Sequence, residues 1–298
     1  MKLRSLIILL LTLTVTQLAY GQTADPSSSN ANSYKAVNDS WKPSLRKDGV
    51  IDRVPHKHIL TPWQSIRETD VLWQKRVWRE IDTRQKQNYP FRYPGDEYSG
   101  GGNYIEILLN AIRTGKVTAF RDERFTTPLT YEDVMSQVVG DPDTAVVENE
   151  LGELEYQIVQ KQFDPDNVTK FRLKEDWIFD RKVGRMVNRI LGISPYLDKY
   201  SNESGQLLGS YAMFWVYYPD IRESHVKYEV YNPKNDVFRM TWDDFFEKRM
   251  FSSFIVKSTF NNPQQNDIRS YKDGIYKLYE SEKIKEQIFN KEHDLWVY

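Results

Sequence analysis

The sequence predicts an α+β fold that combines helices with antiparallel strands and hairpins. Apolar side chains recur at helical spacing in residues 62–84. Residues 168–193 instead alternate between apolar and polar side chains around a turn at 182–185, which is typical of a β-hairpin. Residues 118–134 and 229–245 both predict a strand, a polar turn and a helix with an acidic start. This similarity indicates either a duplication into two similar α/β halves or two uses of a common capping pattern.

The first residues have the pattern of a secretory signal peptide. Lys2 and Arg4 make the start basic, residues 5–19 are apolar, and small residues at Ala19 and Gly21 suit a cleavage site. A retained anchor is the alternative, but the apolar run is short for a membrane span and polar residues follow it. We therefore expect a signal peptide at 1–21 and an exported, soluble mature protein.

The remaining chain divides into three parts. Residues 22–60 are rich in Ser, Asn, Asp and Pro, and predict a flexible or extended N-terminal arm that wraps a neighbour or remains a disordered tail. Residues 61–145 form a helix-rich α/β half in this interpretation. Residues 146–298 form an α+β half with a helical C-terminus.

The segment 62–84 predicts an amphipathic helix. Thr61 suits the N-cap and Pro62 the first helical position. One face would be apolar and form core; it contains Trp63, Ile66, Trp73, Val77 and Ile81. Trp78 would lie at the edge of this face beside Arg76 and Arg79. Because Trp and Arg are enriched at binding hot spots, this edge is a candidate partner interface.

Shorter elements follow this segment. Asn103 is placed to cap a helix at 104–113 that Gly115 ends, a short strand follows at 117–120, and Thr130 begins another helix. After the hairpin, we expect strands at 211–218 and 226–231, a helix capped by Thr241, and one or two helices from 267 to about 293 interrupted at Gly274.

Charge is unevenly distributed along a nearly neutral chain. The full sequence has 41 basic and 42 acidic residues, so its composition does not favour binding to nucleic acid. Residues 41–93 contain 12 basic and 6 acidic residues, whereas residues 94–168 contain 5 basic and 15 acidic residues. Such asymmetry favours head-to-tail self-association or docking to a charged partner, although solvated faces are the commoner explanation.

Few residues suggest catalysis or metal binding. The chain has no cysteine, which excludes disulfides, thiolate metal sites and thiol nucleophiles. His56 and His58 have no identifiable carboxylate partner, so we predict no metal, no cofactor and no catalytic residue. Glu175 and Asp176 beside Trp177 are the best enzymatic candidates. They leave one alternative open: a periplasmic glycan-binding or glycan-cleaving protein that uses surface aromatics and paired carboxylates.

Several motifs resemble one known family. They are Asp70-Val-Leu-Trp-Gln-Lys-Arg-Val-Trp-Arg79, Glu175-Asp-Trp-Ile-Phe-Asp180, Arg189-Ile-Leu-Gly-Ile-Ser-Pro195, Phe214-Trp-Val-Tyr-Tyr-Pro-Asp-Ile-Arg222, Thr241-Trp-Asp-Asp-Phe-Phe-Glu-Lys-Arg249, Phe251-Ser-Ser-Phe-Ile-Val-Lys257 and Glu292-His-Asp-Leu-Trp296. In this order they resemble the gliding motility protein GldN, or PorN, family of the Bacteroidetes type IX secretion system. The resemblance covers the chain beyond about residue 33.

The resemblance implies a non-enzymatic periplasmic scaffold. Members of this family would form a ring with an outer-membrane lipoprotein of the GldK/PorK type, and would self-associate within that ring. The ring would contact the periplasmic domain of a GldM/PorM-type motor protein and serve secretion and gliding. The protein would be held at the outer membrane through the lipoprotein, with no span of its own. Its partner-interface candidates are Arg76, Trp78, Arg79, Glu175 and Asp176.

Overall fold

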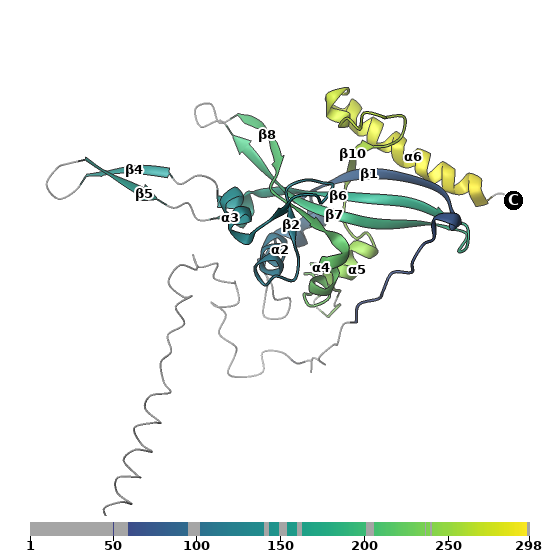
Figure 1. Cartoon of the computed structure of the whole chain (residues 1–298), viewed down its shortest axis with the longest axis horizontal. Helices are drawn as coiled ribbons and strands as arrows, with labels where there is room; N and C mark the ends of the chain where they lie inside the picture. The colour runs from purple at the N-terminus through teal and green to yellow at the C-terminus, as the bar shows by residue number, and fades with distance from the viewer. Residues whose placement is uncertain are drawn as a thin grey trace, which may run out of the picture.

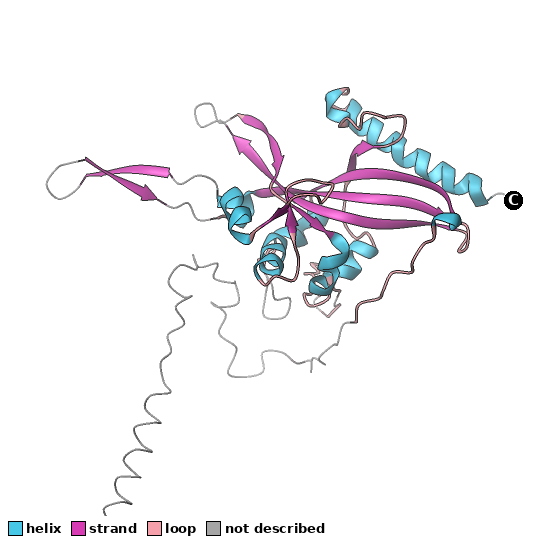
Figure 2. Cartoon of the chain, in the orientation of Figure 1, coloured by secondary structure: helices cyan, strands magenta, loops and turns pink. Residues whose placement is uncertain are grey.

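An eight-stranded antiparallel sheet forms the centre of the protein, and helices pack against it (Figure 1, Figure 2). The computed structural model describes residues 50, 59–94, 102–139, 143–148, 154–159, 163–200 and 206–296, apart from residues 236 and 239. The predicted α+β class is confirmed. The predicted signal peptide and most of the N-terminal arm lie outside the described residues. No helix in the described part of the chain is both long and apolar enough to cross a membrane.

Helices and strands are mixed along the chain. The strands are β1 Val71–Asp82, β2 Ala119–Phe120, β3 Pro128–Leu129, β4 Asp143–Glu148, β5 Leu154–Val159, β6 Val168–Asp180, β7 Arg185–Tyr200, β8 Leu207–Ala212, β9 Trp215–Tyr217 and β10 Phe254–Ser258. The α-helices are α2 Tyr104–Arg113, α3 Tyr131–Val139, α4 Tyr218–His225, α5 Trp242–Glu247 and α6 Tyr276–Trp296. Short 3₁₀ turns occur at Glu68–Asp70, Lys86–Arg92, Pro165–Asn167 and Ile268–Ser270.

Neighbours in the sheet come from distant parts of the sequence. The order is β10-β1-β6-β7-β9-β2-β3, and β8 also pairs with β7. β4 and β5 pair with each other in a separate two-stranded sheet. The large sheet therefore contains strands from both sides of the predicted boundary between residues 145 and 146, while the internal duplication stays a prediction.

The predicted helix at 62–84 is wrong. Residues 71–82 form β1, which pairs with β6 on one side and β10 on the other. Val77 and Ile81 are four residues apart, a spacing that suits one face of a helix and one face of a strand equally well. Both side chains are buried, so this part of the predicted apolar face forms core, as expected from the sequence. Thr61 and Pro62 belong to a segment without regular secondary structure, which we call the strap, residues 59–67.

The predicted β-hairpin is confirmed and is longer than the sequence pattern indicates. β6 and β7 pair from Asp180 and Arg185 inward to Val168 and Leu197. At the turn, the backbone N–H of Gly184 donates to the carbonyl of Asp180 at 2.8 Å, and the φ angle of Gly184 is +69°. Glycine adopts this left-handed conformation without a steric penalty, which explains its place in the turn.

Local capping signals predicted three helices correctly. Asn103 caps α2, and the carboxylate of Glu106 accepts the backbone N–H of Asn103 at 2.9 Å, which completes a capping box. The hydroxyl of Thr130 accepts the N–H of Asp133 at 3.2 Å at the start of α3. The hydroxyl of Thr241 accepts the N–H of Asp244 at 3.1 Å at the start of α5.

Other predicted elements differ from the structure. The expected strand at 211–218 is divided between β8 and β9, and Pro219 lies in the first turn of α4 rather than ending a strand. Within 226–231 the structure contains a turn and a single bridge from Glu229 to Thr241 instead of a strand. The C-terminal helix is present as α6, but the sequence pattern did not predict β4, β5 or β10.

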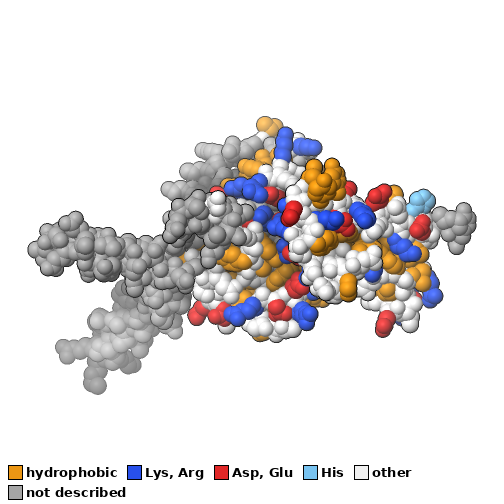
Figure 3. Space-filling view, turned by 90° about the horizontal axis from the view of Figure 1, so that it is seen from above, with side chains coloured by type: hydrophobic (Ala, Val, Ile, Leu, Met, Phe, Trp, Pro, Cys, Tyr) orange, Lys and Arg blue, Asp and Glu red, His pale blue; other side chains and the backbone are white. Residues whose placement is uncertain are grey.

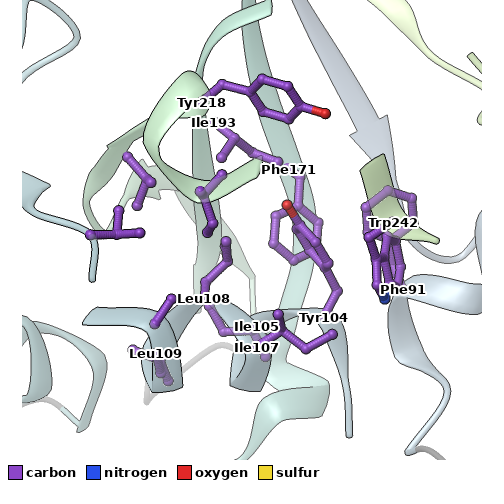
Figure 4. Close-up of a cluster of buried hydrophobic side chains, with 14 of the residues drawn as sticks. Phe91, Tyr104, Ile105, Ile107, Leu108, Leu109, Phe171, Ile193, Tyr218 and Trp242 are labelled. Atoms are coloured by element: carbon purple, nitrogen blue, oxygen red, sulfur yellow. The ribbon is translucent and has the colours of Figure 1, made fainter. Parts of the chain in front are cut away.

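The largest hydrophobic cluster lies between the sheet and helices α2, α4 and α5 (Figure 4). Aromatic rings dominate it: the ring centroids of Phe91 and Tyr104 are 5.2 Å apart, and those of Tyr104 and Trp242 are 4.5 Å apart. His225 is fully buried in this cluster, and its Nε2 lies 3.0 Å from the hydroxyl of Tyr104. Burial lowers the pKa of His225 to about 3, so its ring is neutral at pH 7.

Two smaller clusters contact other parts of the sheet. One contains Val77 and Ile255 with Ile284 and Ile288 of α6, and so attaches the C-terminal helix to the sheet. The other contains Trp78, Trp215 and Val256. The core is thus divided into three patches, and charged side chains lie between them.

Candidate interaction site

Four of the five predicted interface residues form ion pairs between β1 and β6. The guanidinium of Arg76 donates to both carboxylate oxygens of Asp176, at 2.6 and 2.8 Å. The side-chain amide of Gln74 also donates to Asp176, at 2.9 Å. The Arg76 side chain is 36% exposed and that of Asp176 is 7% exposed, so this pair lies at the surface with its carboxylate covered.

The second pair belongs to a buried three-residue cluster. Glu175 is fully buried and accepts from Arg79 Nε at 2.5 Å and from Arg249 Nη1 at 2.8 Å. Trp177 Nε1 and Asn188 Nδ2 donate to the same carboxylate at 3.1 and 3.2 Å. Burial opposes ionisation of Glu175, but Arg249 and Arg79 outweigh it and lower its pKa to about 2.

The Arg79–Glu175–Arg249 cluster separates two hydrophobic clusters on the same face of the sheet. On β1, Arg79 lies between Ile81 of the largest cluster and Val77 of the cluster under α6. On β6, Glu175 similarly lies between Leu173 and Trp177. Because alternate residues of a strand share a face, the ion-pair cluster lies between the two hydrophobic clusters and does not face solvent.

Trp78 is not at an exposed edge, which corrects the sequence prediction. It is 2% exposed and packs against Trp215 and Val256. Lys257 Nζ lies 4.1 Å from the centre of its ring. The reason is the strand conformation of β1, which points Trp78 away from Val77 and into a separate core patch. Of the five predicted interface residues, only Arg76 has a substantially exposed side chain.

The alternation of side chains along a strand is also relevant to the glycan-cleaving alternative. Glu175 and Asp176 are consecutive on β6, so their carboxylates point to opposite faces of the sheet. Each is already neutralised by arginine. Two carboxylates on either side of one glycosidic bond would have to face a common cleft. This geometry does not provide the predicted catalytic pair.

A cavity of about 360 Å³ lies beside the β6–β7 turn. The strap, the turn and helices α4 and α5 surround it; its lining includes Trp63, Arg185, Arg189, Arg222, Asp243 and Glu247. The ring of Trp63 lies between two guanidinium groups, with the Arg222 Cζ 4.5 Å and the Arg189 Cζ 4.9 Å from its centroid. Such cation–π contacts hold the strap on the body of the protein.

The two arginines beside Trp63 differ in their partners. Arg222 donates to both oxygens of Asp243 at 2.8 and 2.9 Å and to the carbonyl of Thr61 at 2.9 Å. Arg189 forms no side-chain hydrogen bond or ion pair with any residue that the structure describes. Burial and the charge of Arg222 lower the pKa of Arg189, while Glu247 opposes that shift. Arg189 is therefore a guanidinium with donors available at the cavity.

The turn beside this cavity is basic. Arg181, Lys182 and Arg185 are exposed, and within the described parts of the chain their side chains have no ion-pair partner. Together with Arg189 they form what we call the basic turn. The sequence prediction treated 182–185 only as a hairpin turn, although the cluster of cations there was visible. No group of His, Cys, Asp and Glu suited to a metal ion occurs among the residues that the structure describes.

The other notable surface is on α6. Tyr276 and Tyr279 are 66% and 63% exposed, and their ring centroids are 6.4 Å apart. Ile275 and Leu278 beside them are also exposed. Figure 3 shows the corresponding face of the molecule, where hydrophobic side chains gather between positive and negative ones. Exposed apolar groups with a charged rim are typical of protein interaction surfaces.

A comparison with protein families gives one match. The family model described as gliding motility associated protein GldN matches residues 66–297, which include the sheet, α6 and the basic turn. No curated protein matches the chain.

Proposed function

The chain belongs to the family of gliding motility associated protein GldN, and we propose that it is a non-enzymatic scaffold of the type IX secretion and gliding machinery. The observation that carries this proposal is the family match over residues 66–297. The engagement of Glu175 and Asp176 in ion pairs supports a structural rather than catalytic role for these carboxylates.

The proposed location is the periplasm, and the proposed assembly is a ring. In it the protein binds an outer-membrane lipoprotein of the GldK/PorK type, which holds it at the outer membrane. It also contacts the periplasmic domain of a GldM/PorM-type motor protein and associates with further copies of itself. The exposed apolar surface of α6 supports the need for a protein partner, because water contact with such a surface is unfavourable.

Affinity purification from the host envelope tests this function. A tagged copy is extracted with mild detergent, and proteins recovered with it are identified by mass spectrometry. We expect an outer-membrane lipoprotein and an inner-membrane motor protein in amounts comparable to the bait. Recovery of the tagged chain without either, under conditions where its own fold is intact, would count against the scaffold role.

A surface variant tests whether α6 is the contact surface in this experiment. Tyr276→Ser with Tyr279→Ser removes two exposed rings of α6 and should reduce recovery of one partner without lowering the free energy of unfolding. Tyr211→Ser is a matched control, because Tyr211 is also exposed but lies on β8. Equal recovery with both variants would exclude α6 as the contact surface.

A further inference from the structure

The cavity between the strap and the β6–β7 turn is lined by charges of both signs. Its volume of about 360 Å³ lies within the range of about 300–1,000 Å³ that is usual for small-molecule sites. Three arginines and four carboxylates belong to its lining, so negative groups outnumber positive ones. A ligand with several negative charges and no positive charge would be repelled by these carboxylates. The lining therefore does not favour a polyanion.

Some of the charged residues at the cavity already have partners. Arg222 donates to both carboxylate oxygens of Asp243, at 2.8 and 2.9 Å. Asp244 pairs with Lys248 at 3.2 Å. Asp180 is 4% exposed and accepts a backbone N–H of the β6–β7 turn at 2.8 Å. A ligand that bound any of these groups would have to compete with an existing charge-assisted hydrogen bond.

Arg189 and Glu247 keep hydrogen-bonding capacity that is not used. Arg189 of β7 forms no side-chain hydrogen bond or ion pair within the described parts of the chain. Among the same residues, Glu247 of α5 accepts only from Trp63, through Oε1, so its Oε2 has no donor. Burial lowers the pKa of Arg189 and raises the pKa of Glu247, and the charge of each opposes the shift of the other. The two groups therefore interact electrostatically across the cavity without forming an ion pair.

Trp63 fixes the positions of these two groups. The Cζ of Arg189 lies 4.9 Å from its ring centroid, and its Nε1 donates to Glu247 at 3.0 Å. On its other side, the Cζ of Arg222 lies 4.5 Å from the same ring. An indole that contacts both side chains limits their rotamer freedom before a ligand arrives. Such preorganisation increases affinity, because less side-chain entropy is lost on binding.

The same cavity has an apolar part. Ile66 of the strap and Val183 and Val187 of the β6–β7 hairpin line it. Val187 lies between Arg185 and Arg189 on one face of β7, since alternate residues of a strand share a face. An apolar group of a ligand would therefore lie next to the free guanidinium of Arg189.

We propose that this cavity binds a small zwitterion, an α-amino acid or a dipeptide with an apolar side chain. Arg189 binds the carboxylate of the ligand through two parallel hydrogen bonds, and Glu247 accepts from its ammonium group. Val183 and Val187 contact its apolar side chain. One charge of each sign pairs both free groups and adds no net charge to the cavity. This site goes beyond the scaffold function and needs no protein partner.

Isothermal titration calorimetry of the purified chain with L-leucine and with L-leucyl-L-leucine tests the proposal. At least one of them should bind with a dissociation constant below about 1 mM, and the tighter ligand shows whether the site takes an amino acid or a dipeptide. Two analogues of that ligand are matched controls: the N-acetylated form has no ammonium group, and the C-terminal amide has no carboxylate. Each should bind about tenfold more weakly or worse, the loss expected for one hydrogen bond between charged groups.

Two variants assign the roles of Arg189 and Glu247. Glu247→Gln keeps an oxygen that accepts from Trp63 but removes the charge, so it should weaken binding of the free ligand about tenfold and leave that of the N-acetylated form unchanged. Arg189→Gln should weaken binding of the free ligand similarly and leave that of the amide unchanged. A purely structural effect would weaken all forms alike. Arg181→Gln, on the same turn but outside the cavity lining, should change neither.

Three results would overturn the zwitterion site. They are no binding of either ligand below about 1 mM, an analogue that binds as tightly as the free ligand, and folded Arg189→Gln or Glu247→Gln chains that bind like the wild type. Circular dichroism and thermal unfolding verify the fold of each variant. If a variant does not fold, the two analogues still decide the question, because they are measured on the wild-type chain. None of these results depends on recovery of envelope partners, so the scaffold function is tested separately.

Discussion

Arg249 Nη1 donates to the carboxylate of Glu175 at 2.8 Å and joins residues that are 74 positions apart in the sequence. The φ angle of Arg249 is +52°, a left-handed conformation that is unfavourable for a residue with a side chain. The ion pair with Glu175 and the contact of the guanidinium with Trp177 hold Arg249 in this conformation. The loop after α5 is thereby attached to the centre of the sheet.

Removal of the Glu175 charge should destabilise the protein strongly. Glu175→Gln leaves Arg79 buried with no carboxylate, and breaking a buried ion pair in this way costs about 3–5 kcal/mol. Urea unfolding followed by fluorescence measures the decrease in the free energy of unfolding. Glu132→Gln, at an exposed position, should change the free energy of unfolding by less than about 0.5 kcal/mol. A similar small loss for Glu175→Gln would contradict the importance of the cluster.

Acid should also remove the contribution of Glu175 to the free energy of unfolding. Its pKa is lowered from 4.5 to about 2 in the folded protein, so its stabilising effect is complete above pH 4.5 and is lost as the pH falls towards 2. The free energy of unfolding of the wild type should fall more steeply across this range than that of Glu175→Gln. Parallel curves for the two proteins would show that Glu175 does not titrate as the geometry implies.

His225 should make the protein less stable in mild acid. Its pKa is lowered from 6.5 to about 3 by burial, so below pH 6.5 the unfolded chain binds a proton that the folded protein does not. Stability should therefore decrease by about 2 kcal/mol between pH 7 and pH 5 through this residue. His225→Gln should reduce this dependence, whereas His293→Gln, at an exposed position, should preserve it.

Trp78 should behave as a core residue. Trp78→Ala empties a site in the cluster with Trp215 and should lower the free energy of unfolding by about 3–5 kcal/mol. Leu72→Ala is the control on the same strand, because Leu72 is half exposed and should change stability little. Unchanged stability of Trp78→Ala with weakened partner binding would instead support the interface role predicted from the sequence.

Gly192 should not tolerate a side chain. A Cβ atom there would lie 2.7 Å from Cζ of Phe125 and 3.4 Å from Trp215. Gly192→Ala should therefore destabilise the protein by about 1–3 kcal/mol through overpacking. The cost should be smaller in a Phe125→Leu background, which thermal unfolding of the four proteins of this double-mutant cycle measures. Equal cost in both backgrounds would exclude the contact with Phe125 as its cause.

The sequence predicted elements whose signals are local. Asn103, Thr130 and Thr241 each cap the helix expected of them, because the caps bond to backbone within three residues. The β6–β7 hairpin was also predictable, since its strands are adjacent in the sequence and Gly184 supplies the turn. The family resemblance, which used motifs along the whole chain, is confirmed by the match over 66–297.

Non-local pairing decided what the sequence pattern missed. The segment with Trp73, Val77 and Ile81 suits a helix by spacing, but hydrogen bonds to β6 and β10 satisfy its backbone as a strand. Because alternate side chains of a strand point to opposite faces, Trp78 lies in the core and not at the surface edge that a helix would give it. The basic turn and its cavity depend on the strap, α4 and α5 meeting in space, which no local pattern encodes.

By itself, therefore, the sequence determined the α+β class, the capped helices, the central hairpin and the family. Only the tertiary structure decided that β1 lies between β6 and β10, that Glu175 and Asp176 point to opposite faces, and that cations gather beside Trp63. The physical reason is the range of the forces involved. Capping and turn formation act within a few residues, whereas the pairing of β1 with β6 and β10 and the ion pairs of Arg76 and Arg249 join residues at least 74 positions apart.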